Sequence, residues 1–366
     1  MRTKRLLAGF AMLVLVGGQA FAADPRLMNL VMPDATTLAG ANVTNAKTTP
    51  FGQYVLTQLT DTMAQQIQTF VTATGFDPRQ DVSEVLAASS GTAANPSGLV
   101  LATGNFPVTQ ITAAIAANSS QLTVQNYGGA TLITGGDARA TWSVAFLGTT
   151  IAAMGDTPSV KAAVDRSSGA NSINPSLAAQ VQALSTTEDA WAVTNTPIST
   201  MLAGLTGPPA AGTAPATGTA PASPVSQFGQ MFNSIQSWSG GVLFGSNVQI
   251  TGQAITADAG SAKSIADVMT ALVSIAAMSN GQTTGGTASA FSSLAQLLKG
   301  LTVTASGTTI NLAMSVPETQ LENVLNALKT PAAKPAVRPA AAPKASVAPA
   351  AAGPVAVAAR TSDARQ

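Results

Sequence analysis

The side chains best suited to chemistry in this sequence are two groups of carboxylates. Asp77, Asp81 and Glu84 lie close together, and Glu188 is followed directly by Asp189. Two carboxyl groups held at a set separation across a cleft can act as acid and base, or as nucleophile, in glycoside hydrolysis. A carboxylate-based hydrolase is the enzyme class that the composition leaves most open.

The local sequence around the first group favours a structural role instead. Asp77 precedes Pro78, which is typical of a helix N-cap followed by proline at the first helical position. Asp81 and Glu84 would then lie in the first helical turn, where the helix dipole favours acids. We therefore interpret these carboxylates as parts of the fold.

The sequence contains no motif for the other common kinds of catalytic or metal-binding site. The chain has no cysteine and no histidine, which excludes disulfides, thiolate nucleophiles, Ser-His-Asp triads and histidine-ligated metals. No lysine after residue 22 has a serine three positions before it, and no spaced Asp/Asn calcium loop occurs. The sequence predicts a protein that is not an enzyme, with no catalytic, cofactor-binding or metal-binding residue and no cofactor.

Aromatic platforms for sugars or bases are not predicted either. Hydrophobic residues make up 46% of the chain but aromatic residues only 4%, so aliphatic side chains must build most of the core. The few large polar aromatics each lie within an apolar pattern and are predicted to pack in the core: Tyr54, Tyr127, Trp142, Trp191 and Trp238.

Charge is scarce and unevenly distributed. Charged residues are 9% of the chain, so Thr, Ser, Asn and Gln must supply most of the polar surface. Residues 23–329 hold nine Lys/Arg against fifteen Asp/Glu, whereas residues 330–366 hold five Lys/Arg against one Asp. Because an acidic body repels phosphate, we predict no nucleic-acid partner.

The clearest structural unit lies in residues 300–329. Leu301, Val303 and Ala305 alternate with polar residues, Ser306-Gly307 supplies a turn, and a second alternating stretch runs from Ile310 to Met314. A helix then follows, with an apolar stripe formed by Leu321, Val324, Leu325 and Leu328. This is a β-hairpin followed by a helix that can pack back on the sheet.

The first half of the chain mixes helices and strands in the same way. Leu56, Leu59, Met63, Ile67 and Phe70 indicate one long amphipathic helix that Gly75 ends. A strand is predicted before it, a helix after Pro107 and another at Pro158. Further strands are predicted at 99–103, 122–127, 130–134, 141–147 and 150–154.

The second half is predicted to repeat this plan. Val193-Thr194-Asn195 matches Val43-Thr44-Asn45, and Phe228-Gly229-Gln230 matches Phe51-Gly52-Gln53. A helix at 232–238 and a hairpin at 242–257 are expected next. The fold class is therefore α+β, with two similar lobes at 23–184 and 185–329, each an antiparallel-rich sheet with helices packed on one face.

The two ends of the chain and one insertion lie outside these lobes. Residues 1–22 have the charged start, apolar run and Ala20-Phe21-Ala22 cleavage site of a signal peptide, so cleavage after Ala22 and a periplasmic or extracellular location are predicted. No later segment is predicted to cross a membrane. The Pro/Ala/Gly/Thr-rich insertion at 207–224 and the Ala/Pro-rich basic tail at 330–366 are predicted to be disordered.

A series of short motifs resembles a family of exported bacterial proteins of unknown function. The resemblance covers roughly residues 30–165, and it implies a duplicated helix-plus-sheet fold and export, with no catalytic residues. The motifs that carry it are Gly75-Phe76-Asp77-Pro78-Arg79, Asp81-Val82, the Gly98–Phe106 stretch, Tyr127-Gly128 and Gly155-Asp156-x-Pro158.

These observations lead to a non-enzymatic, secreted or periplasmic, envelope-associated binding or structural protein. Its basic tail is expected to reach a cell-envelope component. The alternative is a carrier of a small apolar ligand such as a lipid, held in the space between the long helix and the sheet. A carboxylate-based hydrolase is the third possibility.

Overall fold

The computed structural model describes most of the region between the predicted signal peptide and the predicted tail. Residues 1–22, the insertion at 207–224 and residues 330–366 lie outside the described part. The described residues are 23–61, 63–91, 96–118, 121–137, 140–169, 173–197, 233–278, 297 and 300–329.

Runs of strands and runs of helices follow one another along the chain. The strands are β1 Thr37–Asn42, β2 Val82–Gly91, β3 Pro96–Gly104, β4 Thr123–Tyr127, β5 Ala130–Asp137, β6 Ala140–Leu147, β7 Ile151–Asp156, β8 Ala190–Thr194, β9 Ile235–Leu243, β10 Asn247–Thr256, β11 Leu301–Ser306 and β12 Thr309–Pro317. The helices are α2 Pro25–Leu30, α3 Val43–Ala46, α4 Pro50–Asp61, α5 Ala64–Thr74, α6 Pro78–Asp81, α7 Val108–Asn118, α8 Thr157–Arg166, α9 Pro175–Ser185, α12 Ala259–Met278 and α14 Glu318–Lys329.

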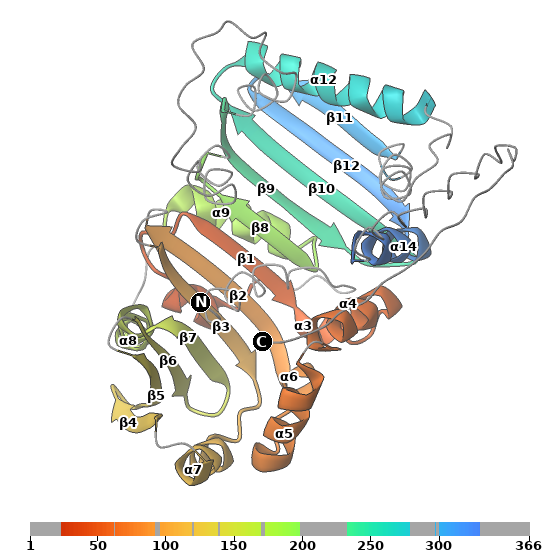
Figure 1. Ribbon diagram of the computed structural model, residues 1–366. Coiled ribbons are helices and arrows are strands. Elements are labelled where there is room, and N and C mark those ends of the chain that lie inside the picture. Colours follow the sequence, from red (N-terminus) through yellow and green to blue (C-terminus); the bar gives the residue numbers. More distant parts are fainter. Residues whose placement is uncertain are drawn as a thin grey trace, which may run out of the picture. The chain divides into compact units, whose positions relative to one another are not determined.

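Within the described residues, the strands form one 12-stranded sheet in the order β11-β12-β10-β9-β8-β1-β2-β3-β7-β6-β5-β4 (Figure 1). Each recorded pairing is antiparallel. The predicted α+β class with antiparallel sheet is confirmed. Strands from both predicted lobes share this one sheet, because β1 of the first half pairs with β8 of the second.

The two halves of the chain meet at a seam, which is the antiparallel pair of β1 and β8. At this seam the two strands approach each other closely. Gly40 on β1 is opposite Trp191 on β8. A Cβ atom placed on Gly40 would lie 2.5 Å from Cζ2 of Trp191, so the indole ring covers the glycine. Trp191 is buried, as predicted.

In the first half, helices cover both faces of the sheet. One face packs Leu86, Leu99 and Leu101 against the helices α2, α8 and α9. The other face packs Val85 and Val100 against a second cluster that includes α7. The expectation of helices on one face is therefore too simple here. The physical reason is that apolar residues occupy both faces of β2 and β3, which is typical of strands buried on both sides.

In the second half, the described helices lie on one side, as predicted. Helix α12 packs Ala262, Ile265 and Ala266 against β9, β10 and β12. Helices α4 and α14 pack further along the same strands. Helix α4 comes from the first half of the chain, so it bridges the two predicted lobes.

The predicted long helix is in fact two helices, α4 and α5. Met63 has a non-helical backbone (φ −120°, ψ 11°) between them, and Gly75 ends α5 in the left-handed conformation with φ 72°. Phe51 of α4 packs with Val242, whereas Phe70 of α5 contacts Phe76. The two helices thus serve different apolar clusters, and the break lets each reach its own.

The predicted helix at 232–238 is also wrong, because β9 begins at Ile235 and the hairpin with β10 starts there. Its alternating pattern has Ile235 buried and Gln236 exposed, which suits a strand with one covered face. The hairpin-helix unit at 300–329 is confirmed as β11, β12 and α14, with Gly307 at φ 56° in the turn.

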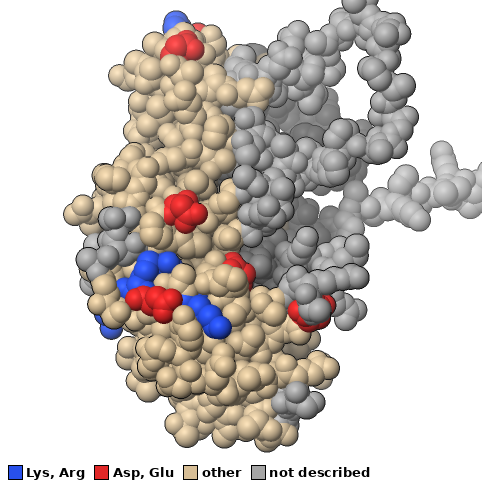
Figure 2. Space-filling view, turned by 90° about the vertical axis from the view of Figure 1, so that its left-hand side faces the viewer, with Lys and Arg blue, Asp and Glu red and all other residues tan. Residues whose placement is uncertain are grey.

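Figure 2 shows how few charged side chains the described surface carries on one face. Acidic and basic side chains lie together in one patch there, and most of the remaining described surface is uncharged. This agrees with the low charge content of the sequence.

The close contact between Gly40 and Trp191 predicts that adding a side chain at position 40 lowers the free energy of unfolding. Gly40→Ala should destabilise the protein by about 1–3 kcal/mol, because the new methyl group overpacks against Trp191. Urea denaturation of the variant and the wild type would measure the difference in unfolding free energy. The matched control is Gly252→Ala in β10, where the nearest atom to an added Cβ is Leu312 Cδ1 at an ordinary 3.4 Å. Equal effects of the two substitutions would contradict the prediction.

Candidate functional site

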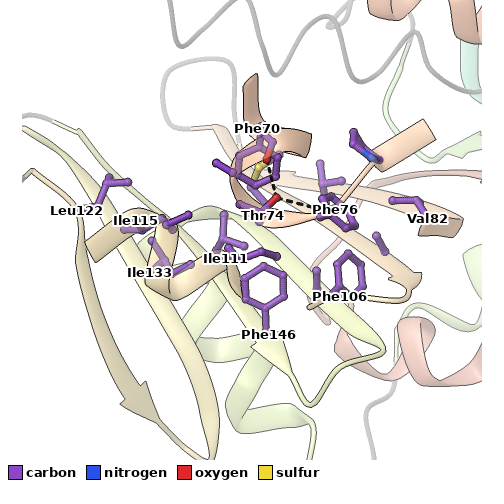
Figure 3. Close-up of a pocket in the computed structure, with 18 of the residues that line it drawn as sticks. Phe70, Thr74, Phe76, Val82, Phe106, Ile111, Ile115, Leu122, Ile133 and Phe146 are labelled. Atoms are coloured by element: carbon purple, nitrogen blue, oxygen red, sulfur yellow. Dashed lines mark hydrogen bonds between the residues drawn. The ribbon is translucent and has the colours of Figure 1, made fainter. Parts of the chain in front are cut away.

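An apolar pocket of about 840 Å³ lies in the first half of the described structure. Its floor is the sheet face formed by β2, β3, β5, β6 and β7, with side chains such as Val100, Ile133 and Phe146. Helices α5 and α7 form its walls, together with the segments that lead into and out of them (Figure 3). This volume falls in the range of about 300–1,000 Å³ that small-molecule sites occupy.

A row of four phenylalanines runs along the pocket. Ring centroids are 6.1 Å apart for Phe70 and Phe76, 5.4 Å for Phe76 and Phe106, and 5.5 Å for Phe106 and Phe146. Phe106 is 4% exposed, whereas Phe70 on α5 is 38% exposed. The row thus runs from a buried wall to a partly open mouth at α5.

The end of α5 is built to turn the chain into the pocket. The Thr74 hydroxyl donates to the Phe70 carbonyl at 2.7 Å and accepts from the Phe76 amide at 3.2 Å. Gly75 adopts the left-handed conformation that closes the helix, and its amide donates to the Val71 carbonyl at 2.7 Å. Phe76 follows directly, and its side chain packs against the buried ring of Phe106.

Helix α5 is held loosely compared with the other walls. Of its described side chains, Thr74 is buried, Ile67 and Val71 are half-buried, and the rest are exposed. Helix α7, by contrast, buries Ile111 in the floor cluster. Among its described residues, α5 therefore buries less apolar side-chain surface than α7 does.

The charged groups nearest this end of the pocket already have partners. Asp77 caps α6 by accepting the Arg79 amide at 3.0 Å, and its carboxylate pairs with the Arg79 guanidinium at 2.8 Å. The hydrogen bond from Arg79 is the main reason why the pKa of Asp77 lies below its usual value. The Lys47 ammonium donates to the carbonyl of Val82 at 2.6 Å, and burial lowers its pKa.

The structure keeps Asp77 and Asp81 together at α6 and places Glu84 apart from them. Asp77 is a helix cap, as predicted, and Asp81 accepts the Asp77 amide at 2.7 Å. Glu84 is not in a helical turn, because α6 ends at Asp81 and Glu84 lies on β2. Its carboxylate accepts the Asp24 amide at 3.1 Å, and burial raises its pKa to about 7.

Glu188 and Asp189 directly precede β8, and each accepts a hydrogen bond from another part of the chain. Glu188 accepts a hydrogen bond from the Thr251 hydroxyl at 2.8 Å, and its pKa is raised, chiefly by burial. Asp189 accepts the Phe244 amide at 2.9 Å. Glu188 covers Gly241, where an added Cβ would lie 2.3 Å from its Cγ. Each acid therefore has a structural contact of its own.

The aromatic residues divide between core and pocket. Tyr54 donates to the Asn326 side chain at 2.6 Å, Tyr127 donates to Asp165 at 3.1 Å, and Trp238 packs beside α12. Trp142 is only half-buried and lines the pocket, which its apolar sequence pattern did not reveal. The spacing of Phe76, Phe106 and Phe146 gives no sign of a row either, because three separate segments bring them together.

Comparisons with known proteins find similarity to solved structures at low sequence identity. No protein-family model matches the chain, and no curated protein matches its sequence. Crystal form I of the protein TP0453 matches with a TM-score of 0.42 and 9% identity over 82% of this chain and 97% of the other. Form IV gives a TM-score of 0.47 at 8% identity over 81% and 95%, and form III gives 0.44 at 9% over 81% and 96%.

Two further findings concern the described residues. None of their helices has the combination of length and apolarity that crossing a bilayer requires. They also contain no group of three or more acidic side chains placed to hold a metal ion together.

Burial of Glu188 predicts a pH effect on stability. A raised pKa means that the folded protein binds this proton more tightly than the unfolded chain does. The contribution of Glu188 to the free energy of unfolding is therefore full below the ordinary pKa of 4.5. It is lost as the pH rises through the higher pKa of the folded state. Glu188→Gln keeps the shape without the charge, so its unfolding free energy should improve relative to wild type as the pH rises from 4.5 to 8.

Urea denaturation across this pH range measures the difference. Asp61→Asn, which removes an exposed acid from α4, is the control variant. A constant gap between Glu188→Gln and wild type would show that the buried carboxyl is not the source of the pH dependence.

Proposed function

We propose that this protein is a non-enzymatic, exported binding protein that holds a small apolar molecule in the pocket beneath α5. The observation that carries the proposal is the pocket itself, with a volume of about 840 Å³ and a predominantly hydrocarbon and aromatic lining. It lies between the sheet and α5, which is the second part of the predicted long helix. The hypothesis of an apolar-ligand carrier needs a space between that helix and the sheet.

Physical chemistry favours occupancy of such a pocket. A well-packed core leaves few voids larger than a water molecule, because empty space forfeits dispersion contacts. A large apolar cavity is poorly suited to water, which needs two to four polar partners. An alkyl chain or a fused-ring hydrocarbon would replace the lost contacts and gain about 25 cal/mol for each Å² of apolar surface removed from water.

Export and envelope association belong to the same proposal. They are supported by the signal-peptide pattern at residues 1–22 and by the basic, proline-rich composition of residues 330–366. A carrier in the envelope would take up an apolar molecule at one site and release it at another. The loosely anchored helix α5 offers a route for that exchange.

The test is binding of the fluorescent apolar probe N-phenyl-1-naphthylamine to the full chain. Ala73→Trp places a large ring at a pocket-lining position on α5 and should weaken probe binding about tenfold or more, which corresponds to about 1.4 kcal/mol. Ala64→Trp puts the same ring on an exposed position of α5 outside the lining and should bind like wild type. Native mass spectrometry of the purified protein should also show a bound lipid-like mass.

Equal probe affinity of the two variants would contradict the pocket assignment. Circular dichroism and thermal melting of both variants would confirm that each is folded. Since both positions are on one helix and carry the same substitution, a difference in binding reports on the pocket and not on helix stability.

A further inference from the structure

The polar groups of the pocket lining indicate what kind of apolar ligand it accepts. The Thr69 hydroxyl donates to the Gln65 carbonyl at 2.9 Å, and the Thr74 hydroxyl is engaged with the α5 backbone. The other side chains in the lining with hydrogen-bonding capacity are the Gln66 amide and the Trp142 indole, and both are uncharged. The named lining residues thus offer neutral polar groups and no ionic partner.

The described cations at the α6 end already interact with acids of this chain. Arg79 is paired with Asp77, and the Lys47 ammonium, which donates to main-chain carbonyls, also interacts electrostatically with Asp81 and Asp77. A carboxylate carried into the pocket would therefore lose its hydration without gaining an ion pair. A buried acid in that position binds as the protonated form instead, and its pKa rises.

We propose that the pocket selects uncharged apolar ligands, such as alkyl chains that end in an alcohol or ester, over the corresponding carboxylate anions. The inference rests on the proposed function, since it concerns the same pocket. A hydroxyl or ester oxygen can hydrogen-bond to the Gln66 amide or the Trp142 indole N–H without a charge being buried.

Competition between two ligands of equal chain length tests this inference. 1-Decanol and decanoate would each displace N-phenyl-1-naphthylamine from the full chain at pH 8. Decanol should bind at least about tenfold more tightly, and the gap should close as the pH falls below 5 and the acid becomes protonated. Decanol should keep the same affinity at both pH values, and Ala73→Trp should lose it.

The outcomes distinguish a failure of the selectivity inference from a failure of the proposed function. If decanoate at pH 8 binds as tightly as decanol, the selectivity inference is overturned and the proposed function stands. If neither ligand displaces the probe and native mass spectrometry shows no bound mass, the proposed function fails as well.

A second observation concerns the first residues that the structure describes. Cleavage after Ala22 would make Ala23 the first residue of the mature chain. Ala23 is half-buried against the core that includes Leu27 and Leu30 of α2. The amide of Asp24 donates to Glu84 Oε1 at 3.1 Å, so the nitrogen of Ala23 is one residue before an amide that binds this half-buried carboxylate.

The other charges around Glu84 form a pair with each other. Arg26 and Asp24 are joined at 2.7 Å, and the aspartate also caps α2. Before cleavage, the Glu84 carboxylate therefore faces a main-chain amide and a pre-formed ion pair. Cleavage turns the Ala23 nitrogen into an ammonium group beside it.

We infer that Glu84 is the acceptor for the amino terminus of the processed chain, so that removal of the leader strengthens the attachment of α2 to the sheet. An ammonium group near a buried carboxylate stabilises both charged forms. The inference is independent of the pocket and rests on the predicted cleavage site.

Reactivity of the amino terminus tests it. In protein exported and processed to begin at Ala23, the α-amino pKa should lie about one unit above its usual value of about 7.7–8.0, as measured by the pH dependence of its acylation. Glu84→Gln should return it to the usual value, whereas Asp34→Asn, at an exposed acid after α2, should not. An intact mass that does not begin at Ala23, or a normal α-amino pKa in the wild type, would overturn the inference.

Discussion

The fold depends on the antiparallel pairing of β1 with β8 at the centre of the sheet. This pair joins strands that are about 150 residues apart in the sequence, and it places Ala39 opposite Ala192 and Gly40 opposite Trp191. The ring of Trp191 needs a residue without a side chain beneath it. Because β8 also pairs with β9, and β1 with β2, every other strand of either half is aligned through this seam.

The seam also explains how helices are shared between the halves. Helix α4 follows β1 in the chain, yet Phe51 and Val55 pack with Val242, Phe244 and Val248 of the second half. Helix α5 turns the other way and covers the first half. The break at Met63 is therefore the point where the chain divides between two apolar surfaces, and the pocket lies on the side where the covering helix is anchored least.

The acids and the apolar surface of the described residues play different parts in this fold. The acids that the composition leaves available cap a helix, accept the amide that follows β9 or accept from a neighbouring hydroxyl. The Phe70, Phe76, Phe106 and Phe146 rings, in contrast, line a hollow that the described side chains leave unfilled. Burial of apolar surface is the interaction that such a site offers, and it favours a ligand with little polarity.

The sequence by itself determined many of the local elements. Alternation in β11 and β12, the cap at Asp77 and the glycine stop at Gly75 depend on neighbouring residues, so they could be predicted. Only the tertiary structure decided the single sheet, the break in the long helix, the strand position of Glu84 and the pocket. These depend on contacts between residues far apart in the chain, such as Phe76 with Phe106 and Gly40 with Trp191, which periodicity does not encode.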